Sequence, residues 1–334
     1  MLRRFAPLAT AALVAACSNN GGNPFGAASP ARPPAADAAI VFVSGSWSAQ
    51  LDAPREIMAT SADGSNPQQL TTCARAAQPC DMLQVAPSPD RERVVAVRTT
   101  PDAEAGTQVL YFMDLSRSVE TIIFPRRRVD SADWSKDGTF LLFASANAQV
   151  GNEDLFTSQP DGTEEQNLTD SLSVRERRAR LDPFGRTAVF ERIDDTGVSR
   201  IYLFRENPVT SGPATGPALA GTPYVVGADA DPAFSPDGTL IVFRRLTGTG
   251  NGGLGTWDLM TTSGAVGAVP QTIATGPLFR GAPDWGRSGI VFVETDAQAS
   301  RSQLVVVQPD GSGRTVLRSE ASGFRMGAPR WIVP

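Results

Sequence analysis

Histidine is absent from the 334-residue sequence, cysteine occurs only three times, and Lys136 is the single lysine. Histidine is the most frequent general base and a common metal ligand, so its absence argues against the catalytic triads and zinc sites that depend on it. The G-x-S-x-G turn that carries the nucleophile of many hydrolases is missing as well. These absences favour a protein that binds without catalysing a reaction, and they predict no cofactor.

A long apolar run is also missing, because the N-terminal apolar segment at residues 5–16 is shorter than the roughly 20 residues that a transmembrane helix needs. Two arginines precede it and Cys17 follows a run of small residues, which is typical of an export signal. The pattern resembles the lipobox of bacterial lipoproteins, which implies that residues 1–17 are a signal peptide and that Cys17 carries the lipid. Ser18 in place of Asp implies the outer membrane. The alternative is an ordinary secreted protein in which Cys17 has no such role.

Residues 18–39 consist largely of Asn, Gly, Ala and Pro and have little to bury, so they predict a flexible tether. A random coil of this length spans roughly 25–30 Å. The remaining chain, residues 40–334, would then be a periplasmic domain that contacts the membrane through its lipid anchor alone.

The other two cysteines, Cys73 and Cys80, lie close together in sequence. An oxidising compartment and an even number of cysteines predict a disulfide between them. A zinc site is the less favoured alternative, because zinc prefers four nitrogen or sulfur ligands and the chain has no histidine.

The sequence is built from a repeat of about 50 residues, a period typical of propellers, solenoids and arrays. The clearest copy is FSPDGTLIVF at 234–243, and weaker copies are PSPDRERVVAV at 87–97, WSKDGTFLLF at 134–143, LDPFGRTAVF at 181–190 and WGRSGIVF at 285–292. In such a turn Pro fixes φ, Asp bonds to its own backbone and Gly accepts a positive φ. We therefore expect this motif to shape a turn rather than to react.

Each repeat divides into four short strands, and no segment has the 3.6-residue apolar period of a helix. Five complete repeats run from about 85 to 320. Three N-terminal strands near 38–45, 55–62 and 66–71 are left over, together with PRWIVP at the C-terminus. These remnants make one further unit. The sequence therefore predicts an all-β, six-bladed β-propeller with four-stranded antiparallel blades, the first of which is closed by the C-terminal strand.

A Ser-Pro-Asp-Gly turn followed later in the repeat by a Pro-Asp-Gly turn, as at 158–169 and 307–317, resembles the repeat of TolB-like propellers. The same repeat occurs in the propeller domains of prolyl oligopeptidase-type peptidases. The resemblance covers residues 40–334, with departures at Arg91, where Gly is expected, and at Phe184, where Asp is expected. TolB itself has a further α/β domain and an N-terminal binding peptide, for which the tether is too short, so we do not expect TolA binding.

The meander topology of a blade sorts its connections onto two faces. We expect the tight turns on one face, and longer irregular loops together with the connections between blades on the other, where function is more often found. Charged residues in the predicted connections are the basic Arg126, Arg128, Arg178 and Arg180 and the acidic Asp229, Asp231 and Asp284. They predict a channel mouth that is basic on one side and acidic on the other.

We expect these charged residues to bind the partner, because the arginine fork suits an anionic group. The alternative is that the arginines are solvated or are paired with the neighbouring acids Glu176, Asp130 and Asp133.

The favoured function is a non-enzymatic, protein-binding scaffold of the cell envelope. The resemblance to TolB implies an envelope protein as partner, for example a peptidoglycan-associated lipoprotein. The formal net charge of −5 argues against nucleic acid, and we expect a monomer. The alternative is binding or processing of a small ligand or saccharide in the central channel, where Asp229 and Asp231 would supply oxygen ligands for a divalent cation.

Overall fold

The computed structural model describes residues 34–46, 54–73, 81–99, 108–117, 119–124, 127–146, 152–171, 173–195, 197–204, 228–249, 251, 254–265, 268–297, 301–320 and 324–332. Strands, turns and irregular segments make up these ranges. A helix long and apolar enough to cross a membrane is not found in them.

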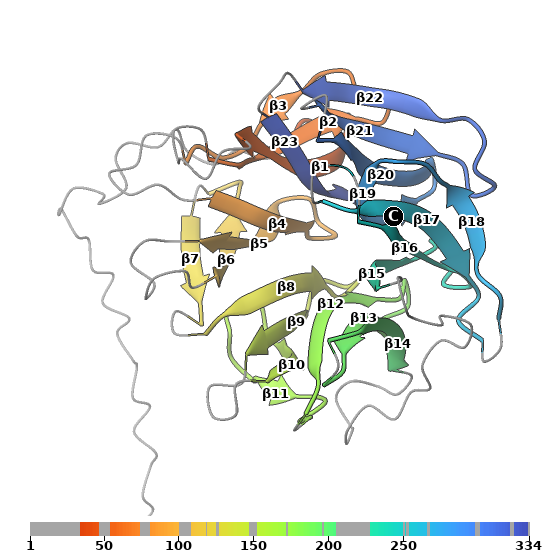
Figure 1. Ribbon diagram of the computed structural model, residues 1–334. Coiled ribbons are helices and arrows are strands. Elements are labelled where there is room, and N and C mark those ends of the chain that lie inside the picture. Colours follow the sequence, from red (N-terminus) through yellow and green to blue (C-terminus); the bar gives the residue numbers. More distant parts are fainter. Residues whose placement is uncertain are drawn as a thin grey trace, which may run out of the picture.

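Six antiparallel sheets surround a central axis as the blades of a propeller (Figure 1). Blade 1 contains β23 (Phe324–Trp331), β1 (Ala38–Ser46), β2 (Glu56–Ser61) and β3 (Gln68–Gln69). Blade 2 contains β4 (Asp81–Pro87), β5 (Arg93–Thr99), β6 (Gln108–Asp114) and β7 (Val119–Ile123). Blade 3 contains β8 (Val129–Trp134), β9 (Leu141–Ala146), β10 (Glu153–Ser158) and β11 (Gln166–Asn167).

The second half of the chain continues the ring. Blade 4 contains β12 (Arg175–Leu181), β13 (Ala188–Ile193) and β14 (Ser199–Phe204). Blade 5 contains β15 (Asp229–Phe234), β16 (Ile241–Gly248), β17 (Thr256–Thr262) and β18 (Gln271–Ala274). Blade 6 contains β19 (Phe279–Gly286), β20 (Gly289–Asp296), β21 (Arg301–Val307) and β22 (Thr315–Glu320). The first strand named for each blade is its inner strand, and inner strands of neighbouring blades contact each other around the axis.

The predicted six blades and the closure of the ring are confirmed. The C-terminal strand β23 pairs with β1, with Trp331 opposite Ile40, and so joins both ends of the chain in blade 1. Five blades have the four predicted strands, whereas blade 4 has three within the described residues and residues 205–227 fall outside them. Strand β1 begins at Ala38, inside the stretch predicted as tether.

The Ser-Pro-Asp-Gly motif of blade 5 forms the turn between β15 and β16. Ser235 Oγ donates to Asp237 at 2.6 Å, and the Leu240 amide donates to Ser235 Oγ at 2.9 Å. Gly238 has a φ of 70°, a left-handed conformation that glycine adopts without strain. Ser135 makes the same contacts in blade 3. The motif therefore shapes the turn, as its residue types predict.

The hydrophobic core lies between the blades. Six apolar clusters each join one blade to its neighbour, and together they close the ring. Blades 1, 3, 4, 5 and 6 each place one fully buried phenylalanine next to the inner strand, namely Phe42, Phe143, Phe190, Phe243 and Phe292. Burial of a phenylalanine contributes roughly 1.5–3 kcal/mol. Packing between blades thus supports the ring, and the inner strands can carry polar side chains toward the axis.

The two ends of the axis differ in the segments that reach them. Each inner strand ends at the face that carries the tight turns, here called the turn face, and begins at the opposite face, here called the loop face. Because β1 is antiparallel to β23, the N-terminal segment reaches the propeller at the turn face. Arg91 Nη2 donates to the carbonyl oxygens of Ala35 at 3.2 Å and Ala38 at 2.8 Å, which holds this segment against blade 2.

Candidate functional site

Irregular pairing interrupts all six inner strands, and in four of them it includes a residue with positive φ. These residues are Arg178, Asp231, Ala282 and Ala328, with φ of 51°, 53°, 47° and 44°. The register of each strand shifts at the same place. Bulges of this kind bend a strand and change the direction of its side chains. The repeated bulge brings side chains of different blades together at the axis.

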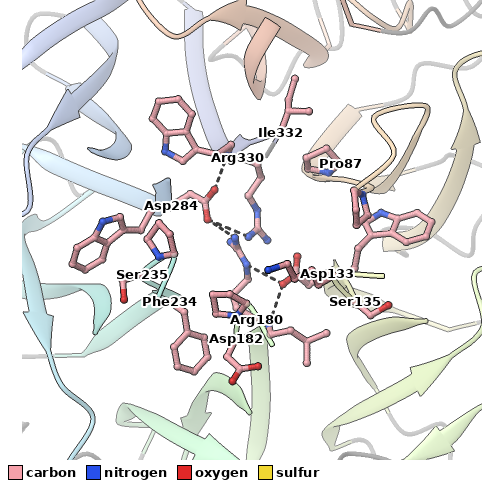
Figure 2. A pocket seen from close by; sticks show the side chains of 18 of the residues that line it. Pro87, Asp133, Ser135, Arg180, Asp182, Phe234, Ser235, Asp284, Arg330 and Ile332 are labelled. Atoms are coloured by element: carbon pink, nitrogen blue, oxygen red, sulfur yellow. Dashed lines mark hydrogen bonds and ion pairs between the residues drawn. The ribbon is translucent and has the colours of Figure 1, made fainter. Parts of the chain in front are cut away.

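One layer of charged side chains lies on the axis near the turn face and is here called the cavity layer: Asp133, Arg180, Asp284 and Arg330. Arg180 is at its centre, with Asp284 on one side and Asp133 on the other (Figure 2). Its Nη2 donates to Asp284, and its Nε lies 3.3 Å from Asp133 Oδ2. Asp284 Oδ2 also accepts the Trp331 amide at 2.7 Å, which links blade 6 to the closing strand.

The carboxyl groups of the cavity layer are held in a partly desolvated position. Burial raises the pKa of Asp133 and of Asp284 above the usual value, while the positive charge of Arg180 opposes the increase. Arg330 Nη1 lies 3.9 Å from Asp284 Oδ1 and has no hydrogen-bond partner. Arg180 is therefore paired on two sides, whereas Arg330 is paired only loosely.

A second group of charges lies deeper along the axis and is here called the inner layer: Arg178, Glu191, Asp231 and Arg244. Asp231 is at its centre, since Arg178 Nη1 donates to one carboxylate oxygen and Arg244 Nε lies 2.5 Å from the other. The Asp231 amide donates to Glu191 Oε1 at 2.6 Å. The guanidinium of Arg244 stacks on Trp257, 3.9 Å from the ring centroid. Ion pairs thus join all four charged groups of this layer, while Arg178 Nε and Arg244 Nε make no hydrogen bond.

The surroundings of the inner layer separate the pKa values of its two acids. Burial raises the pKa of Glu191 to about 7. Burial alone would also raise the pKa of Asp231, but Arg178 and Arg244 outweigh it and hold that pKa well below its usual value. Asp231 in turn raises the pKa of Arg178. At neutral pH this layer holds a firmly ionised aspartate beside a glutamate close to its titration midpoint.

A cavity of about 300 Å³ lies on the turn-face side of the cavity layer. Its lining includes residues of the tight turns, such as Ser135, Ser235 and Arg287, so the cavity belongs to the turn face. Three tryptophans from different blades contribute to its walls: Trp134, Trp285 and Trp331. Below it lies a space of about 30 Å³. Arg180 and Arg330 line both spaces, so these two side chains separate them.

The residues predicted to bind a partner are distributed over three places. Arg180 and Asp284 belong to the cavity layer, and Arg178 and Asp231 belong to the inner layer. Asp229 is fully buried in blade 5, where Arg245 holds both of its carboxylate oxygens at 2.8 and 2.9 Å.

The last two predicted arginines lie before β8. Arg128 bonds to Glu153 at 2.7 Å, and Arg126 is outside the described residues.

Two details of the prediction are wrong. Arg178, Arg180, Asp229, Asp231 and Asp284 lie within inner strands and not in the connections between blades, because the strands begin earlier than the hydrophobic pattern indicates. The mouth is also not divided into a basic and an acidic side, because bases and acids alternate around the axis and form ion pairs. Pairing with an acidic neighbour, the alternative interpretation, holds for Arg180 and Asp133.

The loop face is the face predicted to carry function, whereas the described cavity lies at the turn face. Several irregular loops, including residues 47–53, 100–107, 147–151 and 298–300, are outside the described residues. Cys17 and Cys80 are outside them as well, so the lipid anchor and the disulfide stay predictions. Cys73 is buried, with 2% of its surface exposed.

Three charged residues of the two layers were not predicted from the sequence, namely Arg330, Glu191 and Arg244. Arg330, like Asp133 and Asp284, directly precedes the aligned tryptophan at the end of an inner strand. A charged residue directly before the aligned tryptophan was a usable signal. Glu191 and Arg244 had no such signal, because they reach the axis from second strands. Within the described ranges, no group of three or more His, Cys, Asp or Glu side chains is placed to hold a metal ion.

Comparison with known proteins finds similarity in structure but not in sequence. No protein-family model and no curated protein matches the sequence. TolB from Acinetobacter baumannii is similar with a TM-score of 0.67 and 18% identity, over 89% of this chain and 67% of that chain. A TolB-named protein from Agrobacterium tumefaciens has a TM-score of 0.58 and 14% identity, over 88% and 98% of the two chains.

A structure of a nidogen/laminin complex has a TM-score of 0.59 and 11% identity, over 89% of this chain and 98% of that chain. At such identities the similarity concerns the fold alone. The described inner strands, the closing strand β23 and these similarities together show that the chain has the TolB-like, six-bladed β-propeller fold.

Proposed function

We propose that this protein is a periplasmic, lipid-anchored propeller that binds another protein of the cell envelope and catalyses no reaction itself. The similarity to TolB supports an envelope role, and a structure of nidogen with laminin is a further case in which this fold occurs in a protein complex. A peptidoglycan-associated lipoprotein is one candidate partner. The proposal includes a signal peptide at residues 1–17, lipidation of Cys17, attachment to the outer membrane and a Cys73–Cys80 disulfide.

The observation that carries this proposal is an exposed aromatic side chain beside the turn-face cavity. Phe184 is 59% exposed and stands where the clearest repeats have an aspartate such as Asp237. Asp237 accepts hydrogen bonds within its turn, which a phenylalanine cannot do. The preceding Pro183 lines the cavity, and Lys136 lies 5.8 Å from the Phe184 ring centroid. Exposed aromatic residues next to a pocket are typical of protein-binding surfaces.

The position of the N-terminal segment supports the turn face as the side toward the membrane. This segment reaches blade 1 at the turn face, where Arg91 holds the backbone of Ala35 and Ala38. A tether that starts there and ends in a lipid at Cys17 would attach the domain to the membrane from its turn face. A partner anchored in or near the same membrane is then within reach.

Site-specific crosslinking in native membranes tests the proposal. The photo-crosslinking amino acid p-benzoylphenylalanine is placed at position 184 of the tagged full-length protein and, as a matched control, at the exposed position of Val316 on the outermost strand of blade 6. We expect a discrete protein adduct from position 184 and none from position 316, with mass spectrometry identifying the partner. The tagged protein should sediment with membranes, and a Cys17→Ser variant should not.

Equal labelling from both positions, or no adduct from position 184, would contradict a protein-binding turn face. Sedimentation of the Cys17→Ser variant with membranes would contradict the lipid anchor.

A further inference from the structure

We propose that the turn-face cavity binds an apolar residue that ends in a free carboxylate, as at the C-terminus of a protein. This inference rests on the proposed function, because it specifies which part of a protein partner the cavity receives. The structure supports it through the size of the cavity, its unmet hydrogen-bond donors and its charge.

The size and walls of the cavity suit a single apolar residue. Its volume of about 300 Å³ is at the lower end of the range for ligand pockets. Apart from the three tryptophans, the apolar part of the lining consists of Pro87, Pro89, Leu181, Pro183, Phe234, Pro236 and Ile332. Flat aromatic and proline surfaces converge from different blades around a polar floor (Figure 2). An aromatic or aliphatic side chain would bury its surface against these walls.

Two buried donors at this site have no hydrogen-bond acceptor. Trp331 Nε1 and Arg330 Nη1 both lack a hydrogen-bond partner, and each residue is only 6% exposed. The equivalent Trp134 Nε1 in blade 3 donates to the Ala86 carbonyl at 3.1 Å. Leaving a buried donor unpaired is unfavourable. Trp331 Nε1 therefore lacks the internal acceptor that Trp134 Nε1 has.

The nearest carboxylate of the protein cannot supply that acceptor fully. Asp284 Oδ1 accepts Arg180 Nη2, and Asp284 Oδ2 accepts the Trp331 amide. Arg330 Nη1 remains 3.9 Å from Asp284 Oδ1, beyond hydrogen-bonding distance. Asp133 is engaged with Arg180 and with the Leu181 amide. A further acceptor would complete the cavity layer without breaking its ion pairs.

The charge of the lining favours an anionic acceptor. The charged residues of the lining are the cations Lys136, Arg180, Arg287 and Arg330 and the acids Asp133, Asp182 and Asp284. The lining is therefore more basic than acidic, in a chain whose formal net charge is −5. Lys136 and Arg287 are exposed, and neither is in an ion pair within the described part of the chain. Carboxylates form strong, charge-assisted hydrogen bonds with arginine, so a carboxylate suits this site.

A peptide with and without its terminal charge tests the inference on the unmodified protein. The full-length protein in lipid nanodiscs is titrated with N-acetyl-Ala-Ala-Phe carrying a free carboxylate, and with the same peptide as its C-terminal amide. Calorimetry gives the affinities, and tryptophan fluorescence reports occupancy of the cavity. We expect the acid to bind at least about ten-fold more tightly than the amide, because only the acid offers a charged acceptor.

A Trp331→Phe variant keeps an aromatic ring and removes the indole donor, so it should reduce the preference for the acid. A Val316→Ala variant on the outer strand of blade 6 is the matched control and should leave the preference unchanged. The comparison of the two peptides on the wild-type protein needs no variant, so the inference stays testable if Trp331→Phe fails to fold.

Equal affinity for acid and amide, or no binding of either, would overturn the inference. Binding of 3-phenylpropionate as tight as that of the peptide acid would also overturn it, because the site would then serve small acids and not the end of a protein. Failure here is distinct from failure of the proposed function. A protein adduct from position 184 without binding of the acid peptide would leave a protein-binding propeller whose partner does not insert its C-terminus.

Discussion

The cavity layer and the inner layer are built from the same residue types, two acids and two arginines each, yet their surroundings differ. In the inner layer Asp231 has an arginine on each carboxylate oxygen, and its Oδ2 also accepts the Ala282 amide at 3.1 Å. In the cavity layer Arg330 lacks a hydrogen-bond partner for Nη1, and a cavity of about 300 Å³ lies next to it. Both layers contain buried arginine nitrogens without a hydrogen bond, namely Arg178 Nε and Arg244 Nε in the inner layer and Arg330 Nη1 in the cavity layer. The layers differ in the space beside them, about 30 Å³ next to the inner layer and about 300 Å³ next to the cavity layer.

This difference separates a structural role from a binding role. Removing one partner of a buried ion pair is strongly destabilising, because the remaining charge stays buried without compensation. The same removal beside a cavity is milder, since solvent or a ligand can approach the remaining charge. We therefore expect substitutions in the inner layer to change stability and substitutions in the cavity layer to change binding.

The largest effect is expected for Asp231→Asn. The substitution leaves Arg178 and Arg244 without their shared carboxylate, and Asn accepts the positive φ of 53° at this position, so backbone strain does not contribute. Breaking a buried ion pair lowers the free energy of unfolding by about 3–5 kcal/mol. The Arg178 side chain is 31% exposed, so we expect the lower end of this range, about 3 kcal/mol. Urea denaturation followed by tryptophan fluorescence measures it. A loss below about 1 kcal/mol, the level of a surface pair, would contradict a structural role for the inner layer.

An effect of intermediate size is expected in the pH dependence of stability. Burial raises the pKa of Glu191 to about 7 from its ordinary value of 4.5, so between these pH values the folded chain keeps a proton that the unfolded chain releases. The contribution of Glu191 to stability is complete below pH 4.5 and is lost as the pH rises to about 7. Relative to Glu191→Gln, the wild-type protein should lose roughly 2–3 kcal/mol across this window.

Urea denaturation at pH 5 and at pH 8 checks the prediction. Asp237→Asn is a suitable control, because hydrogen bonds within its exposed turn lower the pKa of Asp237, and its titration falls below this window. Parallel pH curves for the wild type and Glu191→Gln would show that solvent reaches the inner layer.

The repeated parts of the fold could be predicted from the sequence, and the contacts across the axis could not. Turn motifs and strands depend on residues close together in the chain, as the bonds of Ser235 within its own turn illustrate. This local dependence is why the six blades and the closing strand were predicted correctly. The pairing of Arg180 with Asp284 joins residues 104 positions apart and depends on bulges that direct side chains to the axis.

The face of the candidate site was missed for a related reason. Tight turns with a clear structural role, such as that of Ser235, predict a face without function. The cavity between these turns arises from the convergence of Trp134, Trp285 and Trp331 from three blades, which no single repeat reveals. The sequence shows that Phe184 departs from the repeat. Only the structure shows that its side chain is exposed at the turn face.

The smallest effect on stability is expected for Asp133→Asn, the counterpart of Asp231→Asn in the cavity layer. Arg180 keeps its bond to Asp284, and the Asn oxygen can still accept the Leu181 amide, which Asp133 now accepts at 3.1 Å. Burial already disfavours the charged form of Asp133 and raises its pKa, so removing the charge also removes that penalty. We expect a loss of less than about 1 kcal/mol in urea denaturation, together with tighter binding of the acid peptide, because a negative charge leaves the cavity floor. A loss as large as that of Asp231→Asn would mean that both layers are structural, and weaker binding of the acid peptide would mean that Asp133 is part of the site as an acceptor.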